Sequence, residues 1–484
     1  MKLSEAFTGL ESAKAHFACS VTRALQSIPG LRSVTFTGSF VEKAGLACIS
    51  DIDVVVVVES LTQACFAACQ SAVTSVAPAD LGLPNHRLII NDTFGPLKFD
   101  QPGVIVIHLM VYDLDTHRDH VLKSPFTCLD WERSLFYTGC SLRTIYPVLP
   151  LQPRQFFEAR RSLNNYLEDI ASGKISYRRH HFADGIRSEI VERLHLDRRH
   201  QGEYAFHIVR NLVANYAKLV RQENRQPTEA ALLDFWRQHL PNCSDFIDWF
   251  GRLSVLKHAR QSDFPADTAD RTQEFLRSFS RELEHTWKQR ATRHLFVRHA
   301  STDLNDGTFL GQRRDPPISV KPAALAVTPR NVFTSPALRC RHTATALAPD
   351  PTATVDARLH EIDYGRAEGL TFAALAANHP EMAIGWQRGE DPSFPEGENT
   401  SVVADRLNSF LDELPEEPSL VVTHNVVLRC LLGAGLGLPL SSWHRIPVAH
   451  LESFEVLRLE GATYLDLSAR QIAEISDALA GHLP

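Results

Sequence analysis

Two short segments of the chain each place a histidine at the end of an apolar run. Residues 295–302 read Leu-Phe-Val-Arg-His-Ala-Ser-Thr, so that Arg298 and His299 follow a predicted buried strand. In residues 419–425, Ser-Leu-Val-Val-Thr-His-Asn, His424 occupies the same place. Open α/β sheets bind their ligands at the carboxyl ends of their strands. An imidazole nitrogen there can attack phosphorus and carry a phosphoryl group, and a guanidinium can hold phosphate oxygens in a bidentate pair.

Three further polar segments lie between those two histidines. They are 311–319 (Gly-Gln-Arg-Arg-Asp-Pro-Pro-Ile-Ser), 334–344, which contains Arg339 at the end of another apolar strand, and 359–369, which contains Glu361. Several cations in one pocket stabilise the charge of a transferring phosphoryl group, and a carboxylic acid can protonate the leaving oxygen. The residue types therefore indicate phosphoryl-transfer chemistry.

Together the five segments resemble the histidine phosphatase superfamily, the phosphoglycerate-mutase-like fold, over about residues 291–484. The resemblance implies that His299 is the phosphorylated nucleophile and that Glu361 is the general acid. It also implies that Arg298 and Arg339 hold the phosphate and that His424 completes a cationic pocket. It implies no cofactor for this domain.

The sequence departs from the family pattern at three positions. Ala300 stands where a Gly usually follows the Arg-His pair, Ser301 replaces the usual Glu after it, and Asn425 replaces the Gly after the second histidine. None of these changes removes a charge that the chemistry needs. Mutases of the superfamily usually carry extra segments that enclose a bisphosphate, and no long insertion separates the segments at 334–344 and 359–369. This favours an open pocket and hydrolysis.

A second pattern with chemical potential lies near the N-terminus. A predicted strand runs into a Gly38-Ser39 turn, and Asp51-Ile-Asp53 opens the next strand, 54–58. Residues i and i+2 of a strand share a face, so the two carboxylates point the same way and repel each other unless a cation lies between them. An oxygen-rich site of this kind suits Mg²⁺. The turn offers N–H groups and a hydroxyl to a phosphate.

This arrangement resembles the polymerase-beta-like nucleotidyltransferase superfamily over about residues 1–145. The resemblance implies that Asp51 and Asp53 bind the metal ions that carry an NTP, and that Gly38 and Ser39 hold its triphosphate.

In that family a third carboxylate normally comes from a later strand. The candidate strand, 104–113, has His108 midway, Asp113 at its far end and Asp100 just before it. The sequence does not decide which of them, if any, takes the third place. A degenerate domain that binds nucleotide without transferring it therefore stays an alternative.

The length of 484 residues indicates several domains. The predicted fold is multidomain, with an α/β nucleotidyltransferase-like domain over 1–147, an all-α substrate-binding domain over 148–290 and an α/β/α histidine phosphatase domain over 291–484. In the middle domain Phe206, Val209, Val213, Tyr216 and Val220 recur at helical spacing and are expected to line one face of a long helix. The basic segment Lys174 to His200 is either a solvated face or a contact for the NTP or a phosphorylated substrate.

Composition narrows the class of protein. A net charge of −7 does not suggest a general nucleic-acid binder, no apolar run approaches the length of a membrane span, and the N-terminus lacks a basic flank and an apolar signal core. Nine scattered cysteines fit a reducing cytoplasm. The sequence does not indicate an oligomeric state.

These patterns predict a cytoplasmic, bifunctional enzyme. It is expected to transfer a nucleotidyl group from an NTP with Mg²⁺, and to hydrolyse a small phosphorylated metabolite or nucleotide. The rival hypothesis keeps only the phosphatase as an enzyme and makes the N-terminal part a nucleotide-binding or sensing module.

Overall fold

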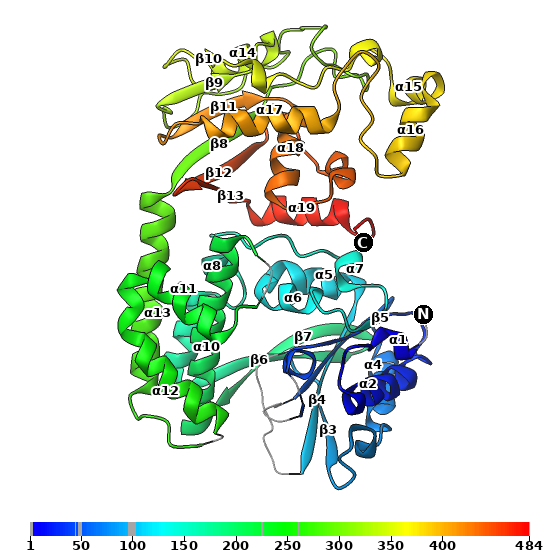
Figure 1. The fold of residues 1–484 in the computed structure, drawn as a ribbon, viewed down its shortest axis with the longest axis vertical. Helices are drawn as coiled ribbons and strands as arrows, with labels where there is room; N and C mark the ends of the chain where they lie inside the picture. The colour runs from blue at the N-terminus through cyan, green and yellow to red at the C-terminus, as the bar shows by residue number, and fades with distance from the viewer. Residues whose placement is uncertain are drawn as a thin grey trace. The chain divides into compact units, whose positions relative to one another are not determined.

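The computed structural model describes residues 3–43, 45–46, 51–94, 103–223, 226–259 and 261–483. By its internal contacts the chain divides into two compact units (Figure 1). The N-terminal unit comprises Met1–Leu283 with Ala480–Pro484, and the C-terminal unit comprises Glu284–Leu479. No helix among the described residues is long and apolar enough to cross a membrane.

The N-terminal unit is built around a five-stranded sheet in the order β3-β4-β2-β1-β5. The strands β2, β3 and β4 are parallel, and β1 runs antiparallel to both of its neighbours. Residues 54–58 of the central β2 are all fully buried, as the continuous valine run predicts. The strands span β1 Leu31–Thr37, β2 Ile52–Val58, β3 Arg87–Asn91, β4 Val104–Asp113 and β5 Tyr137–Gly139.

Short helices cover this sheet. The pair α2 and α4 pack on each other and against the sheet, while α5 and α6 contact β4, β2 and β1 (Figure 1). Alternate valines of β2, Val54, Val56 and Val58, share one apolar core with residues of α2 and α4. The helices are α1 Leu3–Ala6, α2 Ser12–Leu25, α3 Ser39–Glu42, α4 Gln63–Thr74, α5 Leu114–Lys123, α6 Pro125–Glu132 and α7 Leu142–Ile145, with a 3-10 turn at Pro78–Leu81.

The rest of this unit is mainly helical, and one helix confirms its predicted face. Phe206, Val209, Val213 and Tyr216 all lie buried along α10, Arg198–Arg221, whereas Val220 near its end is half-buried. The other helices are α8 Gln155–Glu158, α9 Leu163–Ser172, α11 Glu229–His239, α12 Ile247–His258 and α13 Thr268–Glu284, with a 3-10 helix at Pro241–Phe246.

The prediction of an all-α middle domain is wrong for the basic segment. Residues Lys174–Ala183 and Ile186–His195 form an antiparallel hairpin, β6-β7. Its turn, Asp184-Gly185, has φ angles of 51° and 76°, and an Asp-Gly pair with positive φ at both positions favours a two-residue hairpin turn. Arg178 of β6 and Glu189 of β7 form a cross-strand ion pair, with an N···O distance of 2.6 Å.

The C-terminal unit has a mixed six-stranded sheet in the order β10-β9-β11-β8-β12-β13 (Figure 1). The first four strands are parallel, and β12 runs antiparallel to β8 and β13. A π-helical segment, His285–Arg290, precedes β8. The strands span β8 Thr292–Arg298, β9 Asn331–Thr334, β10 Thr354–Val355, β11 Ser419–Thr423, β12 Ser453–Leu459 and β13 Ala462–Leu465.

Helices pack on this sheet and connect its strands. The helix α14 contacts β9 and β11, and α18 contacts β8 and β13. The α-helices are α14 Leu338–Leu347, α15 Phe372–Asn378, α16 Pro380–Gln387, α17 Thr400–Asp412, α18 Asn425–Gly435 and α19 Ala469–Leu479. Short 3-10 helices lie at Ala357–Leu359, Gly365–Ala367 and Leu440–Arg445.

Candidate active site and candidate metal centre

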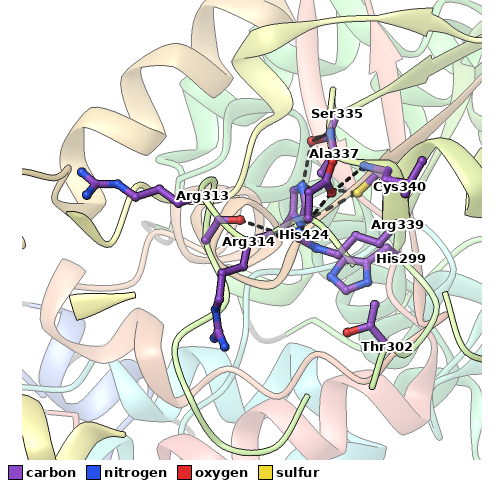
Figure 2. Close-up of polar contacts among 12 residues, drawn as sticks. His299, Thr302, Arg313, Arg314, Ser335, Ala337, Arg339, Cys340 and His424 are labelled. Atoms are coloured by element: carbon purple, nitrogen blue, oxygen red, sulfur yellow. Dashed lines mark hydrogen bonds and ion pairs between the residues drawn. The ribbon is translucent and has the colours of Figure 1, made fainter. Parts of the chain in front are cut away.

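The register of two central strands brings the two predicted histidines together. Strands β8 and β11 are parallel neighbours, and Arg298 pairs with Thr423 at their carboxyl ends. The next residues, His299 and His424, therefore lie at the same sheet edge, with ring centroids 5.1 Å apart. Figure 2 shows both histidines beside Arg339. The edge position expected from the sequence follows from this pairing.

The nucleophile candidate His299 is held in one tautomer. Its Nδ1 lies 2.7 Å from the carbonyl oxygen of Ala300, which can only accept, so Nδ1 carries the proton and Nε2 keeps a lone pair. Burial, and then the positive charge of Arg339, lower the pKa of His299 well below its ordinary value. At neutral pH the ring is therefore uncharged, and Nε2 is ready to attack an electrophile.

Two guanidinium groups beside this ring keep buried donors without partners. Arg339 is fully buried and donates through Nη2 to the Gly311 carbonyl at 2.9 Å, while Arg298 donates through Nη1 to the Val448 carbonyl at 2.5 Å. The Nε–H of each is buried with no hydrogen-bond partner. Buried donors without partners are costly, and an anion that accepts from them would remove that cost.

The acid candidate Glu361 is buried beside these cations. Its Oε1 accepts hydrogen bonds from the backbone N–H groups of Ile362, 3.0 Å, and Val426, 3.2 Å. Burial raises the pKa of Glu361, although these bonds and the nearby charges of Arg339 and Arg298 oppose the rise. A carboxyl group whose pKa is raised keeps its proton to a higher pH, which suits a general acid.

His424 is wholly enclosed. Its Nε2 lies 2.7 Å from Ser335 Oγ and 3.3 Å from Cys340 Sγ (Figure 2). Burial, followed by the charges of Arg339 and His299, lowers the pKa of His424 well below its ordinary value. The predicted role as a cationic partner of phosphate therefore requires that a bound anion raise this pKa again.

Sequence reasoning missed two residues that lie near His299 and Glu361. The Nδ1 of His450 lies 3.1 Å from the carbonyl oxygen of His299, and the two rings are 5.3 Å apart. Arg406 donates to both oxygens of Glu398, each at 3.1 Å, and to the carbonyl oxygen of Glu361 at 3.2 Å. His450 follows no strand, and Arg406 is one of many charged residues on a helix, so neither position carries a sequence signal.

In the N-terminal unit, neighbouring strands bring the second set of candidates together. Asp53 of β2 pairs with Thr37 of β1 on one side and with His108 of β4 on the other. Gly38 follows Thr37 with φ of 69°, and a Cβ there would overlap the Asp53 carboxylate. A glycine is therefore required where the turn passes the carboxylate. Ser39 is the first residue of α3.

Of the described candidates for the third position, His108 lies beside the two aspartates. Its Nδ1 lies 2.9 Å from Asp53 Oδ1, and donor atoms of Asp51, Asp53 and His108 all lie within 4.8 Å of one another. Asp113 instead caps α5 and accepts from Thr116 N–H at 2.9 Å. Asp100 lies outside the described residues. Two carboxylates and one imidazole fit a divalent cation, with a nitrogen where Mg²⁺ usually takes oxygen.

Comparison with known proteins identifies the region around His299. Residues 294–467 match the model of the histidine phosphatase superfamily (branch 1). A "probable phosphoglycerate mutase" of Cronobacter sakazakii is 31% identical over 172 residues, which cover 31% of this chain and 77% of that protein. A glucosyl-3-phosphoglycerate phosphatase of Mycobacterium tuberculosis is 28% identical over 177 residues, covering 32% and 79% respectively.

A third relative is much longer than the matched region. The 6-phosphofructo-2-kinase/fructose-2,6-bisphosphatase of Caenorhabditis elegans is 31% identical over 160 residues, which cover 31% of this chain but only 34% of that protein. These findings do not identify the fold type of the N-terminal unit.

Proposed function

The chain belongs to the histidine phosphatase superfamily (branch 1) through residues 294–467, and from that premise we propose that its C-terminal unit hydrolyses small phosphorylated metabolites through a phosphohistidine at His299. That unit is a histidine phosphatase-like phosphomonoesterase. The observation that carries the proposal is a neutral His299 with its Nε2 lone pair available, beside guanidinium donors that have no partner.

The geometry supports two chemical steps. In the first, Nε2 of His299 attacks phosphorus, the P–O bond to the leaving group breaks, and the Glu361 carboxyl group gives its proton to the leaving oxygen. In the second, the Glu361 carboxylate takes a proton from water as the water oxygen attacks phosphorus, and the P–N bond breaks to release phosphate. Arg298 and Arg339 offset the charge on the phosphoryl oxygens in both steps.

The proposed substrate class is supported by the relatives and by the chain. The relatives are named for small phosphorylated sugars and glycerates, and that class is proposed for this chain as well. No long insertion separates Arg339 from Glu361, whereas mutases of the superfamily usually carry extra segments that enclose a bisphosphate. This favours hydrolysis over transfer of a phosphoryl group between two positions of one substrate.

The test is hydrolysis of a panel of phosphomonoesters by the full chain in the presence of EDTA. Wild type should release phosphate without added metal, because the guanidinium groups supply the positive charge. His299→Ala should abolish release while the far-ultraviolet circular dichroism spectrum stays unchanged. Hydrolysis that requires a metal, or that survives in His299→Ala, would overturn the proposal.

A second candidate function is binding of an NTP, and nucleotidyl transfer from it, in the N-terminal unit. The observation that favours it is the close approach of the Gly38 turn to Asp53, with Asp51 and His108 beside them. A divalent cation held there would carry the NTP phosphates, for which Mg²⁺ is the usual ion. Ser39, next in the chain, is proposed to contact the triphosphate.

Transfer and simple binding give different results. Label from an α-labelled NTP should pass to an acceptor in a cell extract if the unit is a transferase, and Asp53→Asn should stop that passage. If wild type binds the NTP with a divalent cation and transfers nothing, the unit is a nucleotide-binding or sensing module. If the NTP does not bind at all, both forms of the candidate function are wrong.

A further inference from the structure

The imidazole among the aspartates of the N-terminal unit lies on an otherwise apolar strand. Its neighbours on β4, Ile107 and Leu109, are fully buried. The side chain of His108 is 12% exposed, and both of its ring nitrogens face oxygen atoms. A polar ring in such a strand is costly to bury unless its hydrogen bonds or a ligand compensate.

A hydrogen bond from Nε2, on the side of the ring away from the aspartates, fixes the orientation of the His108 ring. Nε2 lies 2.6 Å from the carbonyl oxygen of Thr93, which can only accept, so the Nε2 proton points there. Thr93 is held in turn, because its N–H and its hydroxyl both donate to Asn91 Oδ1, at 3.1 Å and 2.8 Å. Metal-binding histidines commonly donate the second ring N–H to a backbone carbonyl in this way, which aims the other nitrogen at the metal. Here that nitrogen is Nδ1.

The donor atoms have the spacing of ligands around one ion. Two adjacent ligands of an octahedral ion with bonds of about 2.1 Å lie about 3.0 Å apart. The separation of His108 Nδ1 and Asp53 Oδ1 is 2.9 Å, and Asp51 offers an oxygen within 4.8 Å of both. A metal ion bonded to both atoms would replace the proton between Nδ1 and the carboxylate, and it would lie to one side of the line that joins them.

We propose that Asp51, Asp53 and Nδ1 of His108 form a three-ligand site that selects a divalent transition metal over Mg²⁺. Imidazole nitrogen suits Mn²⁺, Co²⁺ or Zn²⁺, whereas Mg²⁺ takes oxygen ligands and gives up its water reluctantly. The inference deepens the second candidate function by naming its metal and its third ligand. It is tested by metal binding alone, so that a failure of nucleotidyl transfer leaves it standing.

The decisive probe is Mn²⁺ bound to the full chain in the absence of nucleotide. Electron paramagnetic resonance gives the number and affinity of bound Mn²⁺ ions, and electron spin echo modulation detects nitrogen coordinated to the ion. Wild type should bind one Mn²⁺ with nitrogen modulation. His108→Ala should lose the modulation and bind at least about tenfold more weakly. The matched control, His181→Ala, removes an exposed histidine of β6 and should change neither result.

Two further variants sharpen the test. His108→Asp creates an all-oxygen site, so Mg²⁺ should compete with Mn²⁺ more effectively than in wild type. Asn91→Ala removes the acceptor of both Thr93 hydrogen bonds, so the carbonyl group that orients His108 is held less firmly. Because Asn91 is a positioning residue, this variant should bind Mn²⁺ about tenfold more weakly while nitrogen modulation persists.

Three outcomes would overturn the inference. They are Mn²⁺ bound to wild type without nitrogen modulation, equal Mn²⁺ affinity in wild type and His108→Ala, and no binding of Mn²⁺ at millimolar concentration. Each would make the contact between Asp53 and His108 a structural ion pair. Because the first and third are measured on wild type, they do not depend on whether a variant folds.

Discussion

Replacing Glu361 with glutamine should remove the proton donor and leave the shape of the pocket intact. The carboxyl group is buried, and its Oε1 accepts two backbone N–H groups, from Ile362 at 3.0 Å and Val426 at 3.2 Å. A glutamine amide oxygen can accept the same two hydrogen bonds. The variant therefore isolates the loss of the acid from any loss of structure.

The size of the effect depends on the leaving group. A positioned general acid contributes about 10²- to 10⁴-fold to the rate, which equals about 3–5 kcal/mol of transition-state stabilisation. Glu361→Gln should lose that much kcat/KM on an alkyl phosphate, whose leaving oxygen needs a proton. On a nitrophenyl phosphate, whose leaving oxygen carries negative charge readily, the loss should be less than about tenfold.

The pH profile gives an independent measure. Because burial raises the pKa of Glu361, its acid form persists above the usual carboxyl range, and kcat/KM for the alkyl ester should fall as pH rises through that pKa. This fall should be absent in Glu361→Gln. On the acid side, burial and Arg339 lower the pKa of His299, so the nucleophile should stay active well below its ordinary pKa.

The assay compares kcat/KM for both esters across pH in wild type and Glu361→Gln, with His299→Ala as the control that loses both activities. Equal losses on the two esters would refute the acid role, because proton donation must matter more for the poorer leaving group. An unchanged alkaline limb in the variant would refute it as well.

Three further predictions concern stability, each measured by urea unfolding. Burial lowers the pKa of His117 to about 4, so the free energy of unfolding of the N-terminal unit should fall by about 3 kcal/mol as pH falls from 6.5 through 4. The His117→Leu variant should lose less over the same pH range, and equal losses would contradict this prediction. Ser335→Ala removes the 2.7 Å hydrogen bond to His424, so it should lower the free energy of unfolding of the C-terminal unit by about 1–3 kcal/mol and also lower kcat/KM. Unchanged stability would show that this hydrogen bond is dispensable. Arg406→Met should lower the free energy of unfolding by about 2–4 kcal/mol. The double variant with Glu398→Gln should lose less than the sum of the losses in the two single variants, and full additivity would disprove their coupling.

The sequence predicted those parts of the fold that local pattern controls. The strand 104–113 was expected at the bounds that β4 has, because ten consecutive residues with one polar interior position leave few alternatives. His299 and His424 were expected at strand ends because apolar runs stop at both places. Their adjacency followed once β8 and β11 paired, which pattern alone does not specify.

The parts that were missed depend on contacts between distant segments. The sequence pattern did not predict the hairpin β6-β7, because charged residues occur throughout both strands. The only local indication of a hairpin was its Asp184-Gly185 turn. The nearness of His108 to Asp53 depended on the register of β2 with β4, which places the two residues opposite each other. A sequence gives residue types, but register and ring orientation are set by tertiary packing.

The most direct test of the central claim is to trap phosphate on His299. Glu361→Gln should form the phosphohistidine from a nitrophenyl phosphate and hydrolyse it slowly, because the base for the second step is missing. Mass spectrometry at alkaline pH, after reaction in EDTA, should then find one phosphoryl group per chain on His299 and none in the His299→Ala, Glu361→Gln double variant. No trapped phosphate, or phosphate on another residue, would contradict a phosphohistidine mechanism for this protein.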